Sequence, residues 1–133
     1  MRILNNTALL DISIPNLTDT GDITVTSNTS LENITFDSLL SISALSLTNN
    51  SDLLSVSAPI LDSVTSHITV DNNTVLETVS FPLLEQITSN LRIEQNPRLS
   101  NILLDSLHYV SGFLKIMNND LLTELSLILT GLL

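Results

Sequence analysis

The sequence contains no cysteine and few aromatic residues. The absence of cysteine excludes disulfide bonds, zinc–thiolate sites and thiol catalysis. Aromatic residues make up only 3% of the chain, with no tryptophan, so the core has to be built from leucine, isoleucine and valine, within an apolar fraction of 43%. Glycine is also scarce, at three residues, which excludes a glycine-rich phosphate-binding loop.

Positive charge is scarce as well. Four lysines and arginines stand against 14 aspartates and glutamates, which gives a net charge of −10. So few cations cannot neutralise a row of phosphates, and nucleic acid is excluded as a partner. The same charge argues against binding to an anionic membrane surface. No apolar run is long enough for a membrane-spanning helix, and no direct membrane insertion is expected.

Internal repetition dominates the sequence. Six segments of 22 or 23 residues begin at Met1, Ile23, Leu45, Ile68, Leu91 and Leu114. When the segments are aligned, positions 1, 3, 9 and 12 are apolar in all six, and position 9 is always leucine. At 43% apolar residues, one such column arises by chance with a probability of about 0.006. Repeats of this length are typical of solenoids, so we predict one solenoid domain over residues 1–133.

The first four residues of a segment predict a short strand. ITVT, LSLT, ITVD and LRIE alternate apolar and polar residues, so the first and third side chains should point inward. A polar turn and further apolar positions complete each unit, without a helix-length run of period 3.6. We therefore predict an all-β solenoid of about six coils, in which the strands of successive coils pair in parallel.

The repeat resembles a known family. Its pattern, L-x-I-x-x-N-x-x-L-x-x-I-x-[FA]-P-x-L-x-x-I, is similar to the receptor L domain, the right-handed β-helix close to leucine-rich repeats in insulin- and EGF-receptor ectodomains. The stretch SFPLLEQITSNLRIEQNPRLSNI looks most like the version in GPI-anchored cell-wall and sporulation-specific surface proteins of fungi. The resemblance implies a right-handed parallel β-helix of LRR-like type.

The resemblance also sets expectations about function. It implies a non-catalytic, extracellular module with a structural or adhesive role in a cell wall or at a cell surface, and wall or surface proteins or glycans as partners. The alternative is the ligand-binding L domain of a receptor ectodomain, and a carbohydrate-active β-helix comes third. The sequence indicates no cofactor and no metal site.

The chain departs from this family at its ends. It lacks a signal peptide, a GPI signal and the cysteine-containing caps that the family implies, so we expect a fragment of a longer surface protein. Solenoids need polar caps to stay soluble, and an uncapped stack exposes strand edges and core leucines. We therefore predict that the isolated chain associates end to end.

Two neighbouring columns are rich in asparagine. Position 6 is asparagine in every segment, and because it follows the strand we predict an inward, structural amide ladder of Asn6, Asn28, Asn50, Asn73, Asn96 and Asn119. Position 5 is polar but variable, as expected of an exposed turn. Asn-x-Ser/Thr triplets predict sites for N-linked sugar, in a secreted protein, at Asn5, Asn16, Asn33, Asn49 and Asn72. Asn28 also begins such a triplet, but its ladder position should prevent modification.

The outward strand positions 2 and 4 form the face on which a site is conceivable. The candidate binding face consists of Thr24, Thr26, Ser46, Thr48, Thr69, Asp71, Arg92 and Glu94. Asp71 and Glu94 could form a polysaccharide-cleaving carboxylate pair. We favour a solvated charge ladder in which Arg92 offsets both acids. The hydroxyl rows resemble an ice-binding array, but they end after about two coils, and no catalytic residue is assigned.

Overall fold

The computed structural model describes residues 1–132, and its regular structure is entirely β. Within that range there is no helix, and the strands form three parallel sheets of six strands each. The prediction of an all-β parallel solenoid is confirmed. Six stacked strands define five turns from strand to equivalent strand, so the solenoid has about five full turns, slightly fewer than the six coils expected.

Sheet A contains the strand that the sequence predicts at the start of each segment. Its strands pair in the order β1 (Arg2–Leu4), β4 (Ile23–Thr26), β7 (Leu45–Thr48), β10 (Ile68–Asp71), β13 (Leu91–Glu94) and β16 (Leu114–Met117). The register follows the repeat, since Ile23 pairs with Leu45 and Ile68 pairs with Leu91. Equivalent positions of successive segments therefore lie side by side.

Two further sheets complete each coil. Sheet B consists of β2 (Asp11–Ser13), β5 (Asn33–Thr35), β8 (Ser55–Ser57), β11 (Thr78–Ser80), β14 (Asn101–Leu103) and β17 (Glu124–Ser126). Sheet C consists of β3 (Asp19–Thr20), β6 (Ser41–Ile42), β9 (Ser63–Val64), β12 (Gln86–Ile87), β15 (Tyr109–Val110) and β18 (Gly131–Leu132). The sequence reading identified only the first strand of each coil explicitly.

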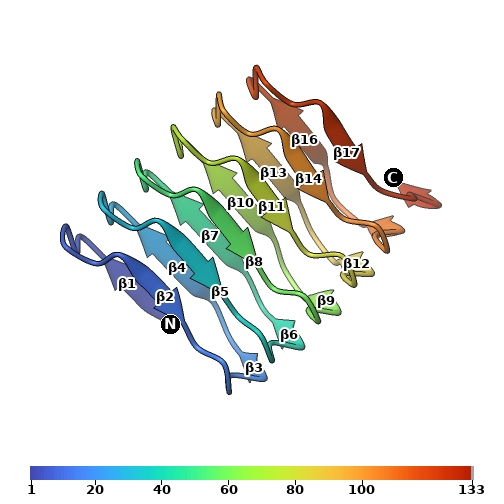
Figure 1. Ribbon diagram of the computed structural model, residues 1–133. Coiled ribbons are helices and arrows are strands. Elements are labelled where there is room, and N and C mark those ends of the chain that lie inside the picture. Colours follow the sequence, from blue (N-terminus) through green and yellow to red (C-terminus); the bar gives the residue numbers. More distant parts are fainter. Residues whose placement is uncertain (133) are drawn as a thin grey trace.

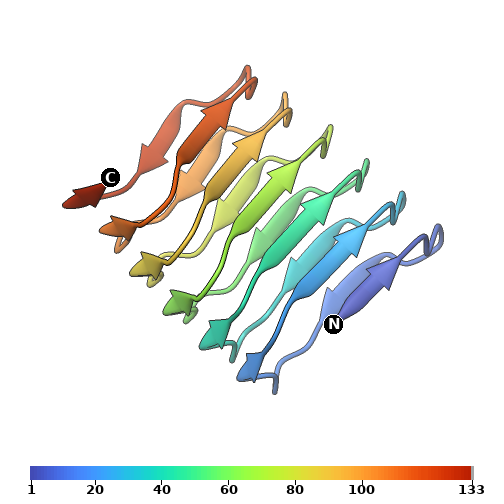
Figure 2. The same cartoon turned by 180° about the vertical axis from the view of Figure 1, so that it is seen from behind.

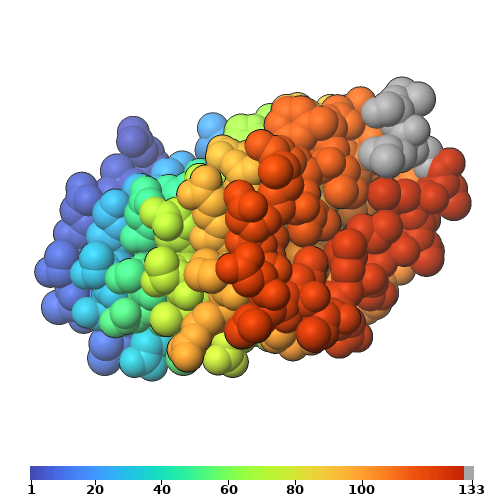
Figure 3. All heavy atoms as spheres, turned by 90° about the horizontal axis from the view of Figure 1, so that it is seen from above, coloured from blue at the N-terminus to red at the C-terminus, as the bar shows by residue number. Residues whose placement is uncertain are grey.

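The coils stack in sequence order into a short rod. Figures 1 and 2 show the two ends of the chain at opposite ends of the stack. Figure 3 shows the coils packed side by side in sequence order along the rod. At a strand spacing of about 4.8 Å, the five steps of a sheet span about 24 Å. Side chains in one column thus form straight rows along the rod axis.

The core consists of the columns that the repeat marks as apolar. Leu31, Leu53, Leu76 and Leu99 of position 9 are fully buried, and so are the inward residues of β4, β7, β10 and β13. Position 14 alternates in size, because Ala58 lies between Phe36 and Phe81 in successive coils and all three are buried. A small residue between two large ones lets stacked layers interdigitate without voids.

Turn chemistry brings the chain from one sheet to the next. Asn50 accepts the amide hydrogen of Leu53 through its carbonyl oxygen at 3.2 Å, and the other position-6 asparagines close the same turn. Asparagine is favoured at the first position of such turns. A second turn contains Pro15, Pro59 or Pro82 in three of the coils, where proline removes no ladder hydrogen bond.

Candidate functional site

The candidate binding face is the outward side of sheet A, where positions 2 and 4 of the repeat form two rows. The first row follows the pairing of Thr24, Ser46, Thr69, Arg92 and Lys115. The second row follows the pairing of Thr26, Thr48, Asp71, Glu94 and Met117. The face therefore changes along the rod from hydroxyl groups to charges, as the sequence predicts.

The hydroxyl half of the face is partly satisfied within itself. Thr26, Thr48 and Thr69 are half-buried, and the Oγ1 atoms of Thr26 and Thr48 are hydrogen-bonded at 2.9 Å. Threonine is a good strand residue on an exposed face, and cross-strand hydroxyl pairs contribute to sheet stability. This half of the face is thus a flat, hydrogen-bonded surface.

The charged half is a compact ion-pair network centred on Glu94. One oxygen of the Glu94 carboxylate accepts hydrogen bonds from the Arg92 guanidinium, and the other lies 2.9 Å from Lys115 Nζ. Arg92 also reaches Asp71, with 3.4 Å between Nη2 and Oδ2. The Glu94 side chain is only 5% exposed. The expectation of a solvated ladder is therefore wrong for Glu94. Two long side chains lie against its carboxylate: Arg92 of the same strand and Lys115 of the next coil.

The network moves the pKa values of Glu94 and Arg92 in opposite directions. The hydrogen bond from Arg92, followed by that from Lys115, lowers the pKa of Glu94 below its ordinary value, although burial acts in the opposite direction. The hydrogen bond to Glu94 raises the pKa of Arg92, and the charge of Asp71 adds to this effect. Glu94 is therefore ionised at neutral pH. One oxygen of Asp71, Oδ1, is buried without a hydrogen-bond partner among the described residues.

An ionised Glu94 that is paired with two cations is better suited to a structural role than to the role of a general acid. A glycoside-cleaving pair requires one carboxylic acid that is still protonated at working pH, which a raised pKa provides. Here the cations act in the opposite direction and hold Glu94 as a carboxylate. Glu94 thus lacks the raised pKa that the acid of such a mechanism requires.

The six position-6 asparagines form a continuous amide ladder behind this face. From Asn28 to Asn119, the side-chain Oδ1 of each ladder asparagine accepts the backbone amide hydrogen of the asparagine in the preceding coil, at 3.0 to 3.1 Å. The side-chain Nδ2 of Asn73, for example, donates to the carbonyls of Leu47 and Asp71 and to Asn96 Oδ1. Asn28, Asn50, Asn73 and Asn96 are fully buried, so these amides replace water for the main chain of the corner.

The backbone at position 5 adopts a left-handed conformation that was not predicted from the sequence. All six of its residues have positive φ, between 55° and 60°: Asn5, Ser27, Asn49, Asn72, Gln95 and Asn118. Among residues with a side chain, asparagine adopts this left-handed conformation most easily. Asparagine at position 5 therefore serves the turn, whether or not it carries a sugar.

The predicted glycosylation sites differ in their surroundings. Asn5, Asn16, Asn49 and Asn72 are exposed. Asn72 Nδ2 donates to Asn49 Oδ1 at 2.5 Å, so these two sites are adjacent, and one attached sugar would crowd the other. Asn33 lies half-buried in β5, where Nδ2 donates to Asp11 and Oδ1 accepts from Ser55. The side-chain amide of Asn33 is therefore engaged on both sides, by the preceding and the following coil.

Neither a metal centre nor a membrane span is found in the part of the chain that the structure describes. No cluster of three potential metal-ligating acidic or histidine side chains occurs within residues 1–132. No helix in that range is long and apolar enough to cross a membrane.

The candidate face also contains two residues that the sequence prediction did not include. Lys115 pairs with Glu94, and Met117 ends the second row with 47% of its surface exposed.

Comparisons with known proteins give no relative. No family model, no curated protein and no solved structure matches this chain.

Proposed function

We propose that this chain is a non-catalytic solenoid module with a structural or adhesive role in a cell-wall or cell-surface protein. The observation that supports the non-catalytic part best is the ion-pair network on sheet A. Both candidate carboxylates are bound by Arg92, and the lowered pKa of Glu94 keeps it ionised. A surface whose charges neutralise one another is suited to stability and to contact, and less suited to proton transfer.

The extracellular part of the proposal rests on the sequence resemblance, and the exposed acceptor sites are compatible with it. Asn5, Asn49 and Asn72 lie in one column at the corner that follows sheet A, and all three are exposed. Sugars attached there would project from one edge of the rod and leave the sheet faces free. The partners on this proposal are other surface components, protein or glycan.

The module is also proposed to associate with copies of itself when this sequence is expressed alone. The terminal coils carry half-buried apolar residues packed on one side only: Met1, Ile3, Leu9, Ile14 and Leu17 at one end, and Leu114, Ile116, Leu122, Leu127 and Leu129 at the other. Apolar ends with open strand edges favour stacking of rods. Light scattering over a concentration series tests this, and a monomer at all concentrations contradicts it.

A panel of polysaccharides, together with intact fungal cell walls, tests the main proposal. The secreted, glycosylated chain should be retained on the walls and should release no new reducing ends from any polysaccharide. Glu94→Gln, which preserves the shape of the side chain, serves as the matched variant. Reducing-end release by the wild-type chain that disappears in Glu94→Gln would establish an enzyme instead. Failure of the glycosylated chain to bind walls or surface proteins would remove the adhesive role.

A ligand-binding module is the second candidate, because the rod has a groove with apolar and acidic walls. This groove lies on a different surface from sheet A.

A further inference from the structure

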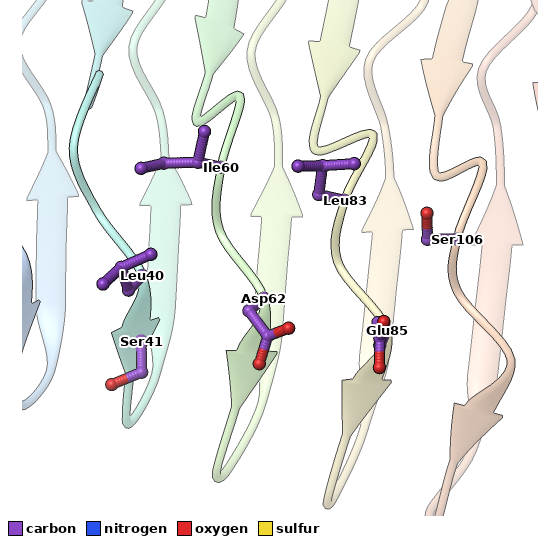
Figure 4. A pocket seen from close by; sticks show the side chains of 7 residues that line it. All are labelled: Leu40, Ser41, Ile60, Asp62, Leu83, Glu85 and Ser106. Atoms are coloured by element: carbon purple, nitrogen blue, oxygen red, sulfur yellow. The ribbon is translucent and has the colours of Figure 1, made fainter.

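A shallow groove of about 610 Å³ runs along the rod between sheet B and sheet C. Figure 4 shows Leu40, Ile60 and Leu83 along this groove in three successive coils, with the carboxylates of Asp62 and Glu85 beside them. Volumes of this size are typical of ligand pockets. The groove is formed by connecting segments, and the apolar columns of the repeat do not contribute to it.

The apolar residues of the groove are exposed although their chain neighbours are buried. Leu40, Ile60 and Leu83 have 45%, 38% and 52% of their surface exposed. Leu61 and Leu84, which directly follow Ile60 and Leu83, are completely buried in the core. The turn thus exposes an aliphatic side chain at the same repeat position in two successive coils, Ile60 and Leu83, and the preceding coil exposes Leu40 two positions later. Contiguous exposed apolar residues that are bordered by polar ones are characteristic of interaction sites.

The groove has a regular spacing, because main-chain hydrogen bonds fix its residues to successive coils. The amide of Asp62 donates to the carbonyl of Leu40 at 2.9 Å, and the amide of Glu85 donates to the carbonyl of Asp62 at 2.8 Å. Each coil therefore advances the groove by about 4.8 Å along the axis, or about 9.6 Å over the three coils. Leu40 lies in one row with Asp62 and Glu85, whereas Ile60 and Leu83 form a second row, two residues earlier in the repeat.

This spacing matches an α-helix better than an extended peptide. Side chains on one face of a helix recur at each turn of about 5.4 Å, so residues i and i+7 lie about 10.5 Å apart. On one face of a strand, residues i and i+4 lie about 13 Å apart, which is longer than the span of about 9.6 Å over the three coils. A helix laid along the groove can thus place apolar side chains of successive turns against Ile60 and Leu83, and the width of its apolar stripe also reaches Leu40 in the neighbouring row.

The negative charge of the groove favours a positively charged occupant. Asp62 and Glu85 are exposed, and none of the described residues that line the groove is basic. The whole chain carries a net charge of −10. At this groove, the acidic surface of a second copy or an anionic membrane would therefore be repelled, whereas lysines and arginines beside an apolar stripe would be attracted.

We propose that the groove formed by Leu40, Ile60, Leu83, Asp62 and Glu85 binds a basic amphipathic helix of a partner protein, lying along the rod axis. The apolar stripe of the helix packs on the three aliphatic side chains, and its cations pair with the two carboxylates. Apolar contacts supply the affinity, and the exposed charges supply association rate and salt dependence.

A labelled 18-residue peptide of leucine and lysine tests the inference. Its leucines recur at i, i+3, i+4 and i+7, and fluorescence anisotropy measures its binding to the full chain. Leu83→Ser should weaken binding about five-fold or more, since it removes the most exposed apolar contact of the groove. Leu10→Ser is the matched control, because Leu10 is 55% exposed on another surface of the first coil. It should change the affinity less than about two-fold.

Charge and competing occupants are tested in the same assay. The pair Asp62→Asn and Glu85→Gln should weaken binding at low salt and reduce its salt dependence, whereas Glu32→Gln with Asp52→Asn, at a separate acidic site, should not. Absence of peptide binding, unchanged binding in Leu83→Ser, or equal binding of a scrambled leucine–lysine peptide would overturn the proposal. Preferential binding of an acidic amphipathic peptide or of anionic phosphatidylserine vesicles, lost in Leu83→Ser, would overturn it too.

Discussion

Asn73→Ala removes one of the two central members of the amide ladder and should destabilise the chain strongly. Asn73 Oδ1 accepts the backbone amide hydrogen of Asn50 at 3.0 Å, and both residues are fully buried. Alanine leaves that donor without a partner. Asn73 Nδ2 also donates to the carbonyls of Leu47 and Asp71, at 3.1 and 3.2 Å, and both of these bonds disappear.

The magnitude follows from the groups left unpaired. A buried donor without a partner costs about 1–3 kcal/mol, and each of the two lost hydrogen bonds contributes about 1 kcal/mol net, so we expect a loss of about 3–5 kcal/mol. With a urea m-value of about 2 kcal/mol/M, the unfolding midpoint should fall by about 1.5–2.5 M. Circular dichroism at the β-sheet wavelength follows the transition.

The position of the asparagine in the ladder provides the control. Asn6 is exposed, and its side chain donates to Leu4 and Asn28. No residue of the described chain donates a backbone amide to Asn6 Oδ1, so Asn6→Ala should cost only about 1 kcal/mol. Equal midpoints for Asn73→Ala and Asn6→Ala would refute the idea that the buried ladder holds the corner.

Three further predictions concern the turn, the ion-pair network and the core. Asn72→Gly should preserve stability, whereas Asn72→Val should cost about 1–2 kcal/mol in urea unfolding, because φ at residue 72 is 56°. Since the pKa of Glu94 is lowered in the folded chain, its stabilisation is complete above the ordinary glutamate pKa near 4.5 and is lost as pH falls through the lowered value. The gap in urea midpoint between wild type and Glu94→Gln should therefore be present at pH 7 and close in acid, whereas a gap that persists at the acid end would contradict this account. Ala58→Leu should cost about 1–3 kcal/mol in the same assay, since Phe36 and Phe81 occupy the flanking layers.

Much of the fold is predictable because solenoid geometry converts sequence columns into spatial rows. The leucines of position 9 and the inward residues of sheet A lie in the core as the repeat predicts. The strands of sheet C, such as β6 and β9, are only two residues long. Alternation over two residues carries no periodic signal, so these strands emerge only when neighbouring coils pair.

On the candidate face, the repeat columns predict which residues lie side by side better than they predict how far each side chain is buried. The columns place Asp71, Arg92 and Glu94 together correctly. Burial of Glu94, however, arises from the reach of Arg92 and Lys115 across it, and a column alignment contains no information on how long side chains fold over a neighbour. The groove was missed for a related reason, since Leu40 and Ile60 occupy different repeat positions and no single column is apolar there.

The glycosylation triplets at Asn49 and Asn72 illustrate how fold and function can produce the same sequence signal. The first residue of each triplet meets the left-handed φ of the turn, and the second, Asn50 or Asn73, belongs to the ladder. The third also has a structural partner, since Thr74 Oγ1 donates to the carbonyl of Ser51 at 3.0 Å. Every residue of the triplet is thus accounted for by the corner alone, so the triplets would recur in this fold without any sugar. The acceptor motif therefore carries little weight for secretion by itself, and attachment of a sugar at Asn49 or Asn72 has to be measured by mass spectrometry of the secreted chain.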